Sequence, residues 1–568
     1  MISSAGFQGS QNNCRRTHPF AALVVPLQAL PWVRAALATK INTSIDASNL
    51  LLVARPDRAW ICRPQFCCAP WLGTPGRCLM LLIAATLVLR VAFGASLGLG
   101  IDESYTVATA RVLQLSYYDH PPLTWWLSWG ISHITGSEAP IIMRLPFILL
   151  FGVTTWLIYI LGGTLFGPRA GLWSAVLLNV TPVFGAVAGT WVLPDGPLDC
   201  ALLGAGVCLV HALAYRPGAA LWWCGAGICA GLALLAKYTV ILTLLGAFLY
   251  LLTQKQHRRW LTRPEPYSAV IIALLLFVPA LMWNAEHGWS SFLFQGSRAT
   301  VEKLRPAMPF VTLAGEAIYI LPWIWLPLIY EFVRALRCGP SDRHEWLLAS
   351  LAIVPIVAFA VISLWAQDRV LYHWATPGYL FLLPLLGRSV AANIDRRNSW
   401  VRAWLIGNVI TVLFGITLAS SEVKWNWLPD VGEKFAPGAD PDLQAVDWTS
   451  VADELLMADL VARPELIVAG IKWYDTGKLD YALRGRKTVI CLCDDGHEYA
   501  YLRPIQDYIG RDILIVAHQS EIDEIRRSYG REFDTIDALK QILVWHAGRP
   551  AEILRLYLGH RLHLNNAP

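Results

Sequence analysis

The most regular pattern in the chain is a series of long apolar runs, separated by short segments that contain charges, Pro or Gly. A membrane-spanning helix needs about 20 predominantly apolar residues, and about eleven runs approach this length. Their approximate limits are 77–97, 141–165, 170–188, 198–214, 219–235, 238–252, 268–284, 310–333, 346–365, 371–386 and 400–420. The pattern predicts a mainly α, polytopic membrane bundle of about eleven transmembrane helices over residues 77–420.

Composition agrees with a membrane protein. Of 568 residues, 55% are hydrophobic and 15% are charged, and the mean hydropathy is +0.45. An ordinary soluble domain is less apolar and more charged than this. The net charge of +5 is small, and Lys and Arg fall mainly in short connections, so we do not expect nucleic-acid binding.

The basic residues also predict the orientation of the bundle. They gather in alternate connections, at Arg169, 255–263, 334–343 and 388–402. Basic loops stay in the cytoplasm, so the opposite connections, which hold most of the acids and histidines, are expected outside. An odd number of helices places residues 421–568 on the outer side as well.

The two ends of the chain differ from the bundle. In residues 421–568, the apolar runs "ELIVAG", "TVICLC" and "DILIVA" alternate with helix-compatible segments such as "SEIDEIRRSYG", which predicts a soluble α/β accessory domain. Cys491 and Cys493 share one face of a predicted strand near His497, which fits a weak metal site or, better, buried cysteines. Residues 1–76 contain no convincing span or signal peptide, so we expect a disordered extension or a misassigned start.

The first outer connection, residues 98–140, contains the densest polar chemistry. Asp102 precedes the helix-compatible "ESYTVATARVLQL" and could serve only as its N-cap, with Glu103 favoured by the helix dipole. A second amphipathic helix is expected from "PPLTWWLSWGISHI". Residues before proline are extended, so a stiff connector would present Asp119 and His120. Residue types alone leave a structural and a ligand-binding role open.

Further polar residues share the expected outer surface. Asp195 in "WVLPDGPLD" could cap the following helix. Lys237 in "LLAKYT" lies between two apolar runs, where a cation is costly unless it snorkels or binds an anion. Two other outer loops, "WNAEHGWSSFLFQGSR" and "QDRVLYHWATPGY", contribute His287, Arg298 and His373. This mixture of acids, cations and aromatic rings suits a ligand with a phosphate, a hydroxylated ring and a lipid tail.

Taken in order, these motifs resemble those of a known family. The series "IDESY", "YYDHPPL", "RLPF", "PDGPL", "GLALLAKYT", "EHGWSSFLFQ" and "HWATPGYLFLLPLLG" covers about residues 79–386. It resembles the polyprenyl-phosphate-dependent glycosyltransferases of the GT-C class (glycosyltransferase family 39), in the protein mannosyltransferase and aminoarabinose transferase-like group. The resemblance implies a multi-pass enzyme of the bacterial inner membrane, with its active site and C-terminal domain in the periplasm. It would transfer a sugar, with inversion, from a polyprenyl-phosphate donor to an envelope lipid, polysaccharide or protein.

The resemblance also implies residue roles. Asp102 would be the catalytic base, which takes the proton of the acceptor hydroxyl, with Glu103 beside it in the catalytic pair. Lys237 would bind the donor phosphate, whose charge grows as it leaves, and Asp195 would contact the sugar. The other expected substrate contacts are Tyr105, Tyr118, His120, Tyr238, Arg298 and His373.

A divalent metal is a further implication of the resemblance. The acid before the Pro-Pro pair, Asp119, matches a residue that can help to bind a metal in the family, and His287 is the second expected ligand. His120 stands where some relatives have Lys, so it would bind phosphate when protonated or bind metal instead. A nucleotide cofactor is not expected, because the sequence shows no GxGxxG, P-loop or cytoplasmic DxD motif.

Two other functions compete with this interpretation. A secondary transporter or flippase of a lipid-linked or small polar substrate would show charges or broken helices near the membrane centre and an internal repeat. The polar groups here gather at one face, without a clear repeat. A scaffold protein would explain interfacial aromatic residues but not the ordered acids and Lys237.

Overall fold

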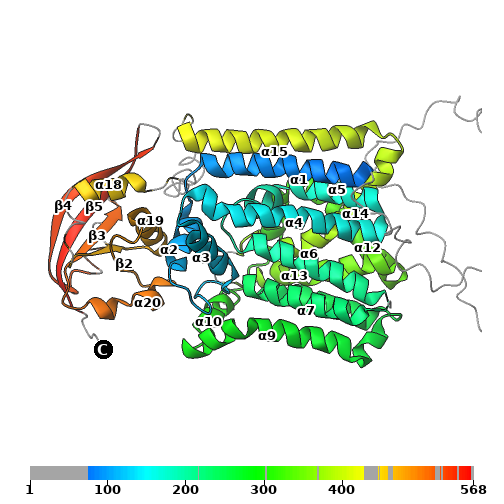
Figure 1. Ribbon diagram of the computed structural model, residues 1–568, viewed down its shortest axis with the longest axis horizontal. Helices are drawn as coiled ribbons and strands as arrows, with labels where there is room; N and C mark the ends of the chain where they lie inside the picture. The colour runs from blue at the N-terminus through cyan, green and yellow to red at the C-terminus, as the bar shows by residue number, and fades with distance from the viewer. Residues whose placement is uncertain are drawn as a thin grey trace, which may run out of the picture.

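The computed structural model describes residues 74–214, 217–300, 303–366, 370–425, 448–457, 465–518, 529–546 and 549–563, and the single residues 427, 446, 463, 525 and 527. Most of the expected N-terminal extension lies outside these ranges. The described chain forms a bundle of long helices with a sheet-containing domain at one end (Figure 1). This is the expected fold class, a mainly α membrane bundle followed by a C-terminal α/β domain.

Each of the eleven predicted runs coincides with a helix or a pair of helices. The bundle consists of α1 (Thr74–Ser96), α4 (Pro140–Phe166), α5 (Pro168–Val180), η5 (Val183–Ala188), α6 (Asp195–Leu213), α7 (Ala219–Ala236), α8 (Val240–Thr253), η6 (Arg258–Thr262), α9 (Pro264–Glu286), α11 (Met308–Ile320), α12 (Pro322–Cys338), η7 (Gly339–Ser341), α13 (Arg343–Ile362), α14 (Thr376–Asp395) and α15 (Ser399–Trp425).

Fewer helices than expected are long and apolar enough to cross a membrane by themselves. Among the described residues, seven are long and apolar enough, namely α1, α4, α6, α7, α9, α13 and α15. An eighth is possible if α11 and α12, which are bent by 115° at Leu321, form one broken span. The run 170–188 is interrupted at Thr181, which is extended because Pro182 follows it. The helix after Lys237, α8, is only 14 residues long.

Close helix contacts rest on small residues. A Cβ at Gly171 in α5 would lie 2.3 Å from the backbone oxygen of Tyr159 in α4. Glycine therefore allows the two backbones to approach, as is common where membrane helices pack. The peripheral helices α1 and α15 lie side by side at one edge of the bundle (Figure 1), and most of their surface faces outwards.

Three short helices lie at the end of the bundle that faces the sheet. These are α2 (Ile101–Ala110) and α3 (Leu123–Thr135) of the first outer connection, and α10 (Ser290–Ser297) (Figure 1). Both helices predicted for residues 98–140 are therefore present. Helix α2 packs directly against α19 of the C-terminal domain.

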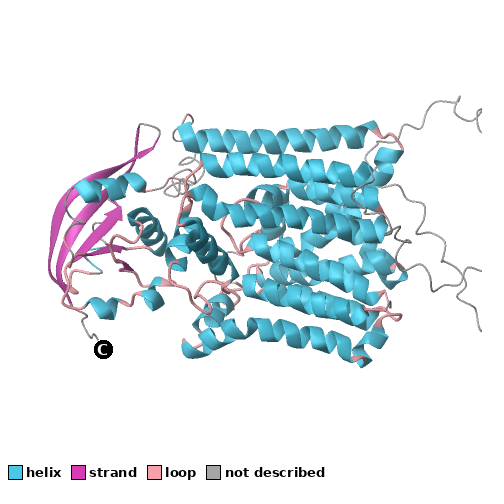
Figure 2. Ribbon diagram, in the orientation of Figure 1, coloured by secondary structure: helices cyan, strands magenta, loops and turns pink. Residues whose placement is uncertain are grey.

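The C-terminal domain is built on a five-stranded mixed sheet, with all described strands in this domain (Figure 2). Its elements are α18 (Thr449–Met457), β1 (Ile467–Gly470), α19 (Trp473–Leu483), β2 (Val489–Cys491), α20 (Tyr499–Leu502), η8 (Ile505–Tyr508), β3 (Ile513–His518), β4 (Phe533–His546) and β5 (Arg549–Leu562). The strand order is β2-β1-β3-β5-β4, with β1 parallel to β2 and β3, and β5 antiparallel to β3 and β4.

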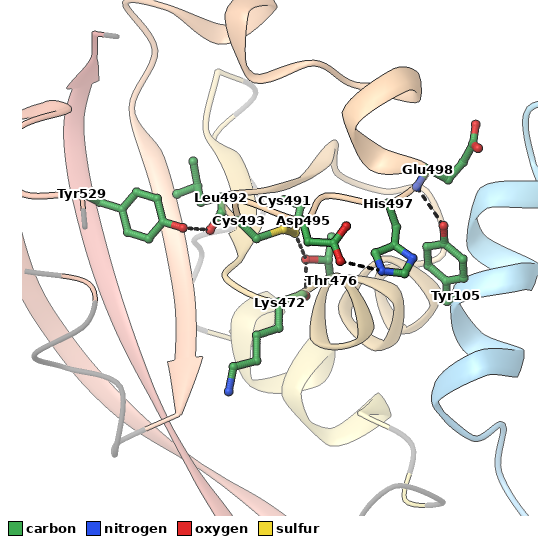
Figure 3. The surroundings of a disulfide bond; sticks show 10 residues. All are labelled: Tyr105, Lys472, Thr476, Cys491, Leu492, Cys493, Asp495, His497, Glu498 and Tyr529. Carbon is green, nitrogen blue, oxygen red and sulfur yellow. Dashed lines mark hydrogen bonds and ion pairs between the residues drawn. A yellow bond between two sulfur atoms is a disulfide. The ribbon is translucent and has the colours of Figure 1, made fainter. Parts of the chain in front are cut away.

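The three apolar runs of the tail are strands β1, β2 and β3, as predicted. Alternate residues of β1 and β3 enter different hydrophobic clusters on the two faces of the sheet, so the strands are apolar throughout. The segment "SEIDEIRRSYG" lies mostly outside the described residues. Cys491 and Cys493 form a disulfide (Figure 3), so they are neither free buried thiols nor metal ligands.

Candidate active site

A cavity of about 290 Å³ lies between the C-terminal domain and the end of the bundle that faces it. It contains eight of the twelve residues expected in the site: Asp102, Tyr105, Asp119, His120, Asp195, Lys237, Arg298 and His373. Other lining side chains include Thr106, Trp125, Phe184, Asp199, Phe294, Tyr319, Trp374, Trp473 and His497. The cavity thus gathers side chains from segments that are far apart in the sequence.

Asp102 faces the cavity from the first turn of α2. The helix begins before it, because Gly100 occupies the N-cap position and the Glu103 carboxylate accepts its backbone N–H at 3.1 Å. Asp102 is therefore not the cap, and it accepts no hydrogen bond from the described part of the chain. The Asp102 residue is solvent-exposed and lines the cavity, yet the surrounding protein still desolvates its carboxylate and, with the charges of Asp119 and Glu103, raises the pKa of Asp102 to about 6.

Glu103 is buried in an ion pair with Arg144. Its carboxylate is buried and accepts hydrogen bonds from the Arg144 guanidinium at 2.5 and 2.8 Å and from the Val192 backbone at 3.0 Å. Arg144 also donates to the backbone oxygens that end α1. The "IDESY" and "RLPF" motifs therefore meet in a buried ion pair that fixes the start of α2. Glu103 does not line the cavity, so its position supports a scaffolding role and not the expected catalytic one.

Asp119 is held from two sides. Its carboxylate accepts hydrogen bonds from the Tyr105 hydroxyl and from Nδ1 of His497. Burial alone would raise the pKa of Asp119, but the bonds from His497 and Tyr105 outweigh it and hold the pKa below its usual range. The pKa of His497 is correspondingly raised, because pairing with Asp119 outweighs burial. Gln295 donates to the Asp119 backbone oxygen at 2.5 Å.

The two histidines predicted in the site are neutral near pH 7. Burial, together with the Lys237 charge, lowers the pKa of His120 to about 3 and that of His373 to about 4. Nδ1 of His120 is buried and has no hydrogen-bond partner among the described residues. His120 therefore presents an uncharged ring to a ligand, and protonated phosphate binding would require strongly acidic conditions.

The cationic side of the cavity is formed by Lys237 and Arg298. Lys237 lies at the break between α7 and α8, and its Nζ is 3.0 Å from Oδ1 of Asp195. The Arg298 guanidinium lies 4.4 Å from the ring centre of Phe294. Asp199 is one turn after Asp195 on α6, and its buried Oδ1 has no partner within the described ranges.

Besides Glu103, three expected site residues lie outside the cavity lining. The Tyr118 backbone donates to Glu498, and its ring packs on Phe294. The Tyr238 hydroxyl bonds to Ser291 at 2.9 Å. His287 bonds through Nδ1 to the Trp283 backbone oxygen and stacks on its ring.

The expected metal ligands do not fit a shared ion. Asp119 lies in the cavity wall and uses its carboxylate oxygens for Tyr105 and His497, whereas His287 is outside the lining. Within the described ranges, no group of three His, Cys, Asp or Glu side chains is arranged to hold a metal. No chemical step is therefore assigned to a metal here.

The structure also adds residues that the sequence did not place in the site, chiefly His497, Trp473 and Asp199. Asp199 was visible as an outer acid one turn after Asp195. His497 was visible only as a histidine near two cysteines. It pairs with Asp119 across 378 residues of sequence, and such a contact has no local signal.

Comparison with known sequences finds similar glycosyltransferases. Residues 119–283 match the family described as dolichyl-phosphate-mannose-protein mannosyltransferase. Lipid A galacturonosyltransferase RgtD of Rhizobium johnstonii is 24% identical over 285 residues, which cover 49% of this chain and 58% of the relative. Lipopolysaccharide core galacturonosyltransferase RgtA of the same organism is 24% identical over 345 residues, covering 57% and 66%. The chain thus spans less than two thirds of either relative.

Solved structures show the same fold over a larger share of the chain. ArnT from Cupriavidus metallidurans bound to undecaprenyl phosphate has a TM-score of 0.58 at 15% identity, covering 85% of this chain and 98% of ArnT. Its apo form gives 0.55 at 14% identity, covering 84% and 97%. These similarities show that the chain shares the fold of ArnT, and its apolar helices show a multi-pass membrane protein; over residues 119–283 it resembles the mannosyltransferase family.

Proposed function

We propose that this protein transfers a sugar from a polyprenyl-phosphate donor to an envelope lipid, polysaccharide or protein at the outer face of the bacterial inner membrane. The family match and the activities of the two relatives support a glycosyltransferase that acts on envelope glycolipids. Those names also make a galacturonosyl donor and a lipid A or core acceptor the first pair to test. The identity of the transferred sugar is therefore also proposed.

One observation carries the proposal: the cavity contains the Asp102 carboxylate, which has no hydrogen-bond partner among the described residues, together with the cations Lys237 and Arg298. Sugar transfer from a lipid phosphate needs both kinds of group. A base must take the proton of the acceptor, and cations must stabilise the phosphate as it leaves. A pKa of about 6 keeps Asp102 mostly ionised, yet basic enough to accept a proton, near pH 7.

The proposed step is a single displacement. The acceptor hydroxyl oxygen attacks the anomeric carbon while Asp102 accepts its proton. The bond from that carbon to the phosphate oxygen breaks, and polyprenyl phosphate leaves with one additional negative charge. Lys237 and Arg298 stabilise this charge, and attack opposite the leaving group inverts the anomeric centre.

The two neutral histidines of the cavity can contribute to sugar binding. His120 and His373 line the cavity as uncharged rings, so they can hydrogen-bond to sugar hydroxyls without adding positive charge. Asp195, paired with Lys237 at 3.0 Å, can orient the lysine and contact the sugar. The cation that faces the phosphate is therefore held by a neighbouring acid in a fixed position.

The distribution of charges supports a periplasmic site. The exposed pair Arg169–Asp395 and the network of Arg334 and Arg388 with Glu345 belong to the basic connections expected in the cytoplasm. The cavity and the C-terminal domain share the connections of opposite character. A lipid-linked donor exposed at the outer leaflet would then reach the site.

The test uses cells that lack the protein and cells complemented with wild type, Asp102→Asn or the exposed control Asp395→Asn. Envelope glycolipids and polyprenyl-phosphate sugars are measured by mass spectrometry. We expect one sugar to disappear from an acceptor and its lipid-linked donor to accumulate, with rescue by wild type and Asp395→Asn only. Full rescue by Asp102→Asn, or an unchanged glycolipid profile in the deletion strain, would contradict the proposal.

A further inference from the structure

The C-terminal domain reaches into the candidate active site with the segment that follows the Cys491–Cys493 disulfide. In this segment, the His497 ring lies beside Tyr105 of α2, and the backbone N–H of Glu498 donates to the Tyr105 hydroxyl (Figure 3). The His497 side chain is buried and lines the cavity. A residue of the terminal domain is thus part of the same wall as Asp102 and Asp119.

Both ring nitrogens of His497 face carboxylates. Nδ1 bonds to Asp119, and Nε2 lies 3.1 Å from Oδ2 of Asp495 (Figure 3). An ionised carboxylate can only accept hydrogen bonds, so both nitrogens must carry protons. The geometry therefore defines His497 as an imidazolium that bridges the membrane part and the C-terminal domain.

The backbone of His497 is also held in an unusual conformation. Its φ is 48°, in the left-handed region that side chains with a Cβ rarely adopt. Its ring stacks on Trp473, with centres 4.5 Å apart. A strained backbone and a stacked ring fix the imidazolium where it meets Asp119.

Neighbouring contacts lock this segment in place. The carboxylate of Glu498 accepts hydrogen bonds from the Tyr118 backbone and from the Gln114 side chain, both at 2.6 Å. The Glu498 backbone N–H donates to the Tyr105 hydroxyl at 2.9 Å. Tyr105 thus connects Glu498 to Asp119, because its hydroxyl donates in turn to the Asp119 carboxylate.

Helix α19 provides a second set of docking contacts. The Arg111 guanidinium bonds to Glu138 and, at 2.9 Å, to Asp480 of α19. The Tyr481 hydroxyl donates to the Glu138 backbone oxygen at 2.9 Å. These bonds join the first outer connection to the domain through α19, in addition to the contacts of the segment that contains His497.

We propose that His497 is a positioning residue of the transfer site and that the C-terminal domain completes this site. The imidazolium fixes and neutralises Asp119, and it leaves Asp102 as the carboxylate that is available to the acceptor. Without it, the buried Asp119 carboxylate would keep Tyr105 as its one side-chain hydrogen-bond partner among the described residues, and it would rearrange or repel the nearby Asp102. This inference rests on the proposed function.

The test compares His497→Ala, His497→Asn and the control His560→Ala in the full-length protein in lipid nanodiscs. His560 also lies between two carboxylates, Asp512 and Asp537, but on the exposed sheet. Asparagine tolerates a positive φ, and its amide can replace the Nδ1–H donor without the charge. Transfer is measured with synthetic undecaprenyl-phosphate galacturonic acid and lipid A, and docking by hydrogen exchange of residues 473–483.

We expect His497→Ala to lower kcat about 10- to 100-fold, the cost of misplacing a reacting group by about 1 Å, with the KM for the donor changed less. His497→Asn should recover part of kcat, and His560→Ala should match wild type. Wild-type turnover in His497→Ala would overturn the inference. So would equal losses in the Ala and Asn variants with unprotected α19, because His497 would then be only a docking contact.

The two proposals can fail separately. A wild-type protein that transfers no sugar from any polyprenyl-phosphate donor would refute the proposed function. An active wild type with an equally active His497→Ala would refute only the positioning role.

Discussion

The pH dependence of transfer tests the assignment of Asp102 most directly. Its carboxyl pKa is about 6, whereas the ordinary value is 3.8. A base must be ionised to accept a proton, so activity should rise with pH through this value. About nine tenths of Asp102 is ionised at pH 7 and about one tenth at pH 5, which predicts about a tenfold fall in rate between them. With an ordinary pKa, the rate would hardly change over this interval.

Neighbouring groups titrate at other pH values, because burial raises the pKa of Glu498 to about 8 and pairing with Asp119 outweighs burial and raises the pKa of His497. Besides desolvation by the surrounding protein, the charges that act on Asp102 are those of Asp119 and Glu103, which raise its pKa, and of His497, which lowers it. The neutral histidines His120 and His373 titrate mainly below pH 5, because their pKa values are about 3 and 4. An acid limb near pH 6 would therefore report the carboxyl of Asp102.

The assay measures kcat/KM for transfer from the lipid-linked donor in nanodiscs between pH 5 and 8. Thermal unfolding at each pH controls for loss of folded protein. Asp102→Asn should abolish transfer at every pH and still insert and fold, because the side-chain shape is kept. A flat wild-type profile, or substantial transfer by Asp102→Asn, would refute the assignment of Asp102 as the base.

Three further substitutions probe the scaffold and the phosphate site. In Gly477→Ala, the new Cβ would lie 2.8 Å from Cα and Cβ of Tyr105, so α19 and α2 must separate; we expect a clear loss of kcat, with Gly130→Ala, which meets no atom within 4 Å, as the control. A wild-type rate in Gly477→Ala would show that this contact does not set the geometry of the site. Glu103→Gln breaks a buried ion pair and should destabilise the protein by about 3–5 kcal/mol, seen as a lower Tm; an unchanged Tm would argue against its scaffolding role. Lys237→Ala should chiefly weaken binding of undecaprenyl phosphate, measured by titration, and unchanged affinity together with unchanged turnover would contradict its phosphate role.

Much of the fold could be predicted because its signals are local. The length of an apolar run indicates whether a helix can span a membrane, and each of the eleven runs forms a helix or a pair of helices. The number of independent spans could not be read in the same way. Breaks at Thr181 and Leu321 depend on how neighbouring helices pack, and hydropathy does not report that packing.

The site shows the same division between local and distant information. Lys237 stood out because an isolated charge between apolar runs is costly, and Asp102 and Asp195 stood out because they match motifs of the family that the sequence resembles; all three line the cavity. Glu103 carried the same sequence signal but is bound by Arg144, which lies 41 residues away. Sequence analysis could find the acid, but it could not tell a free carboxylate from a paired one.

The sequence alone therefore determined the membrane class, the strands of the tail and the motifs that point to the family. Tertiary structure decided which of two adjacent acids faces the cavity, and that the C-terminal domain reaches the site through His497. The physical reason is that burial and charge pairing depend on partners brought together by folding. The bond between His497 and Asp119 spans 378 residues, and no pattern within a local window records it.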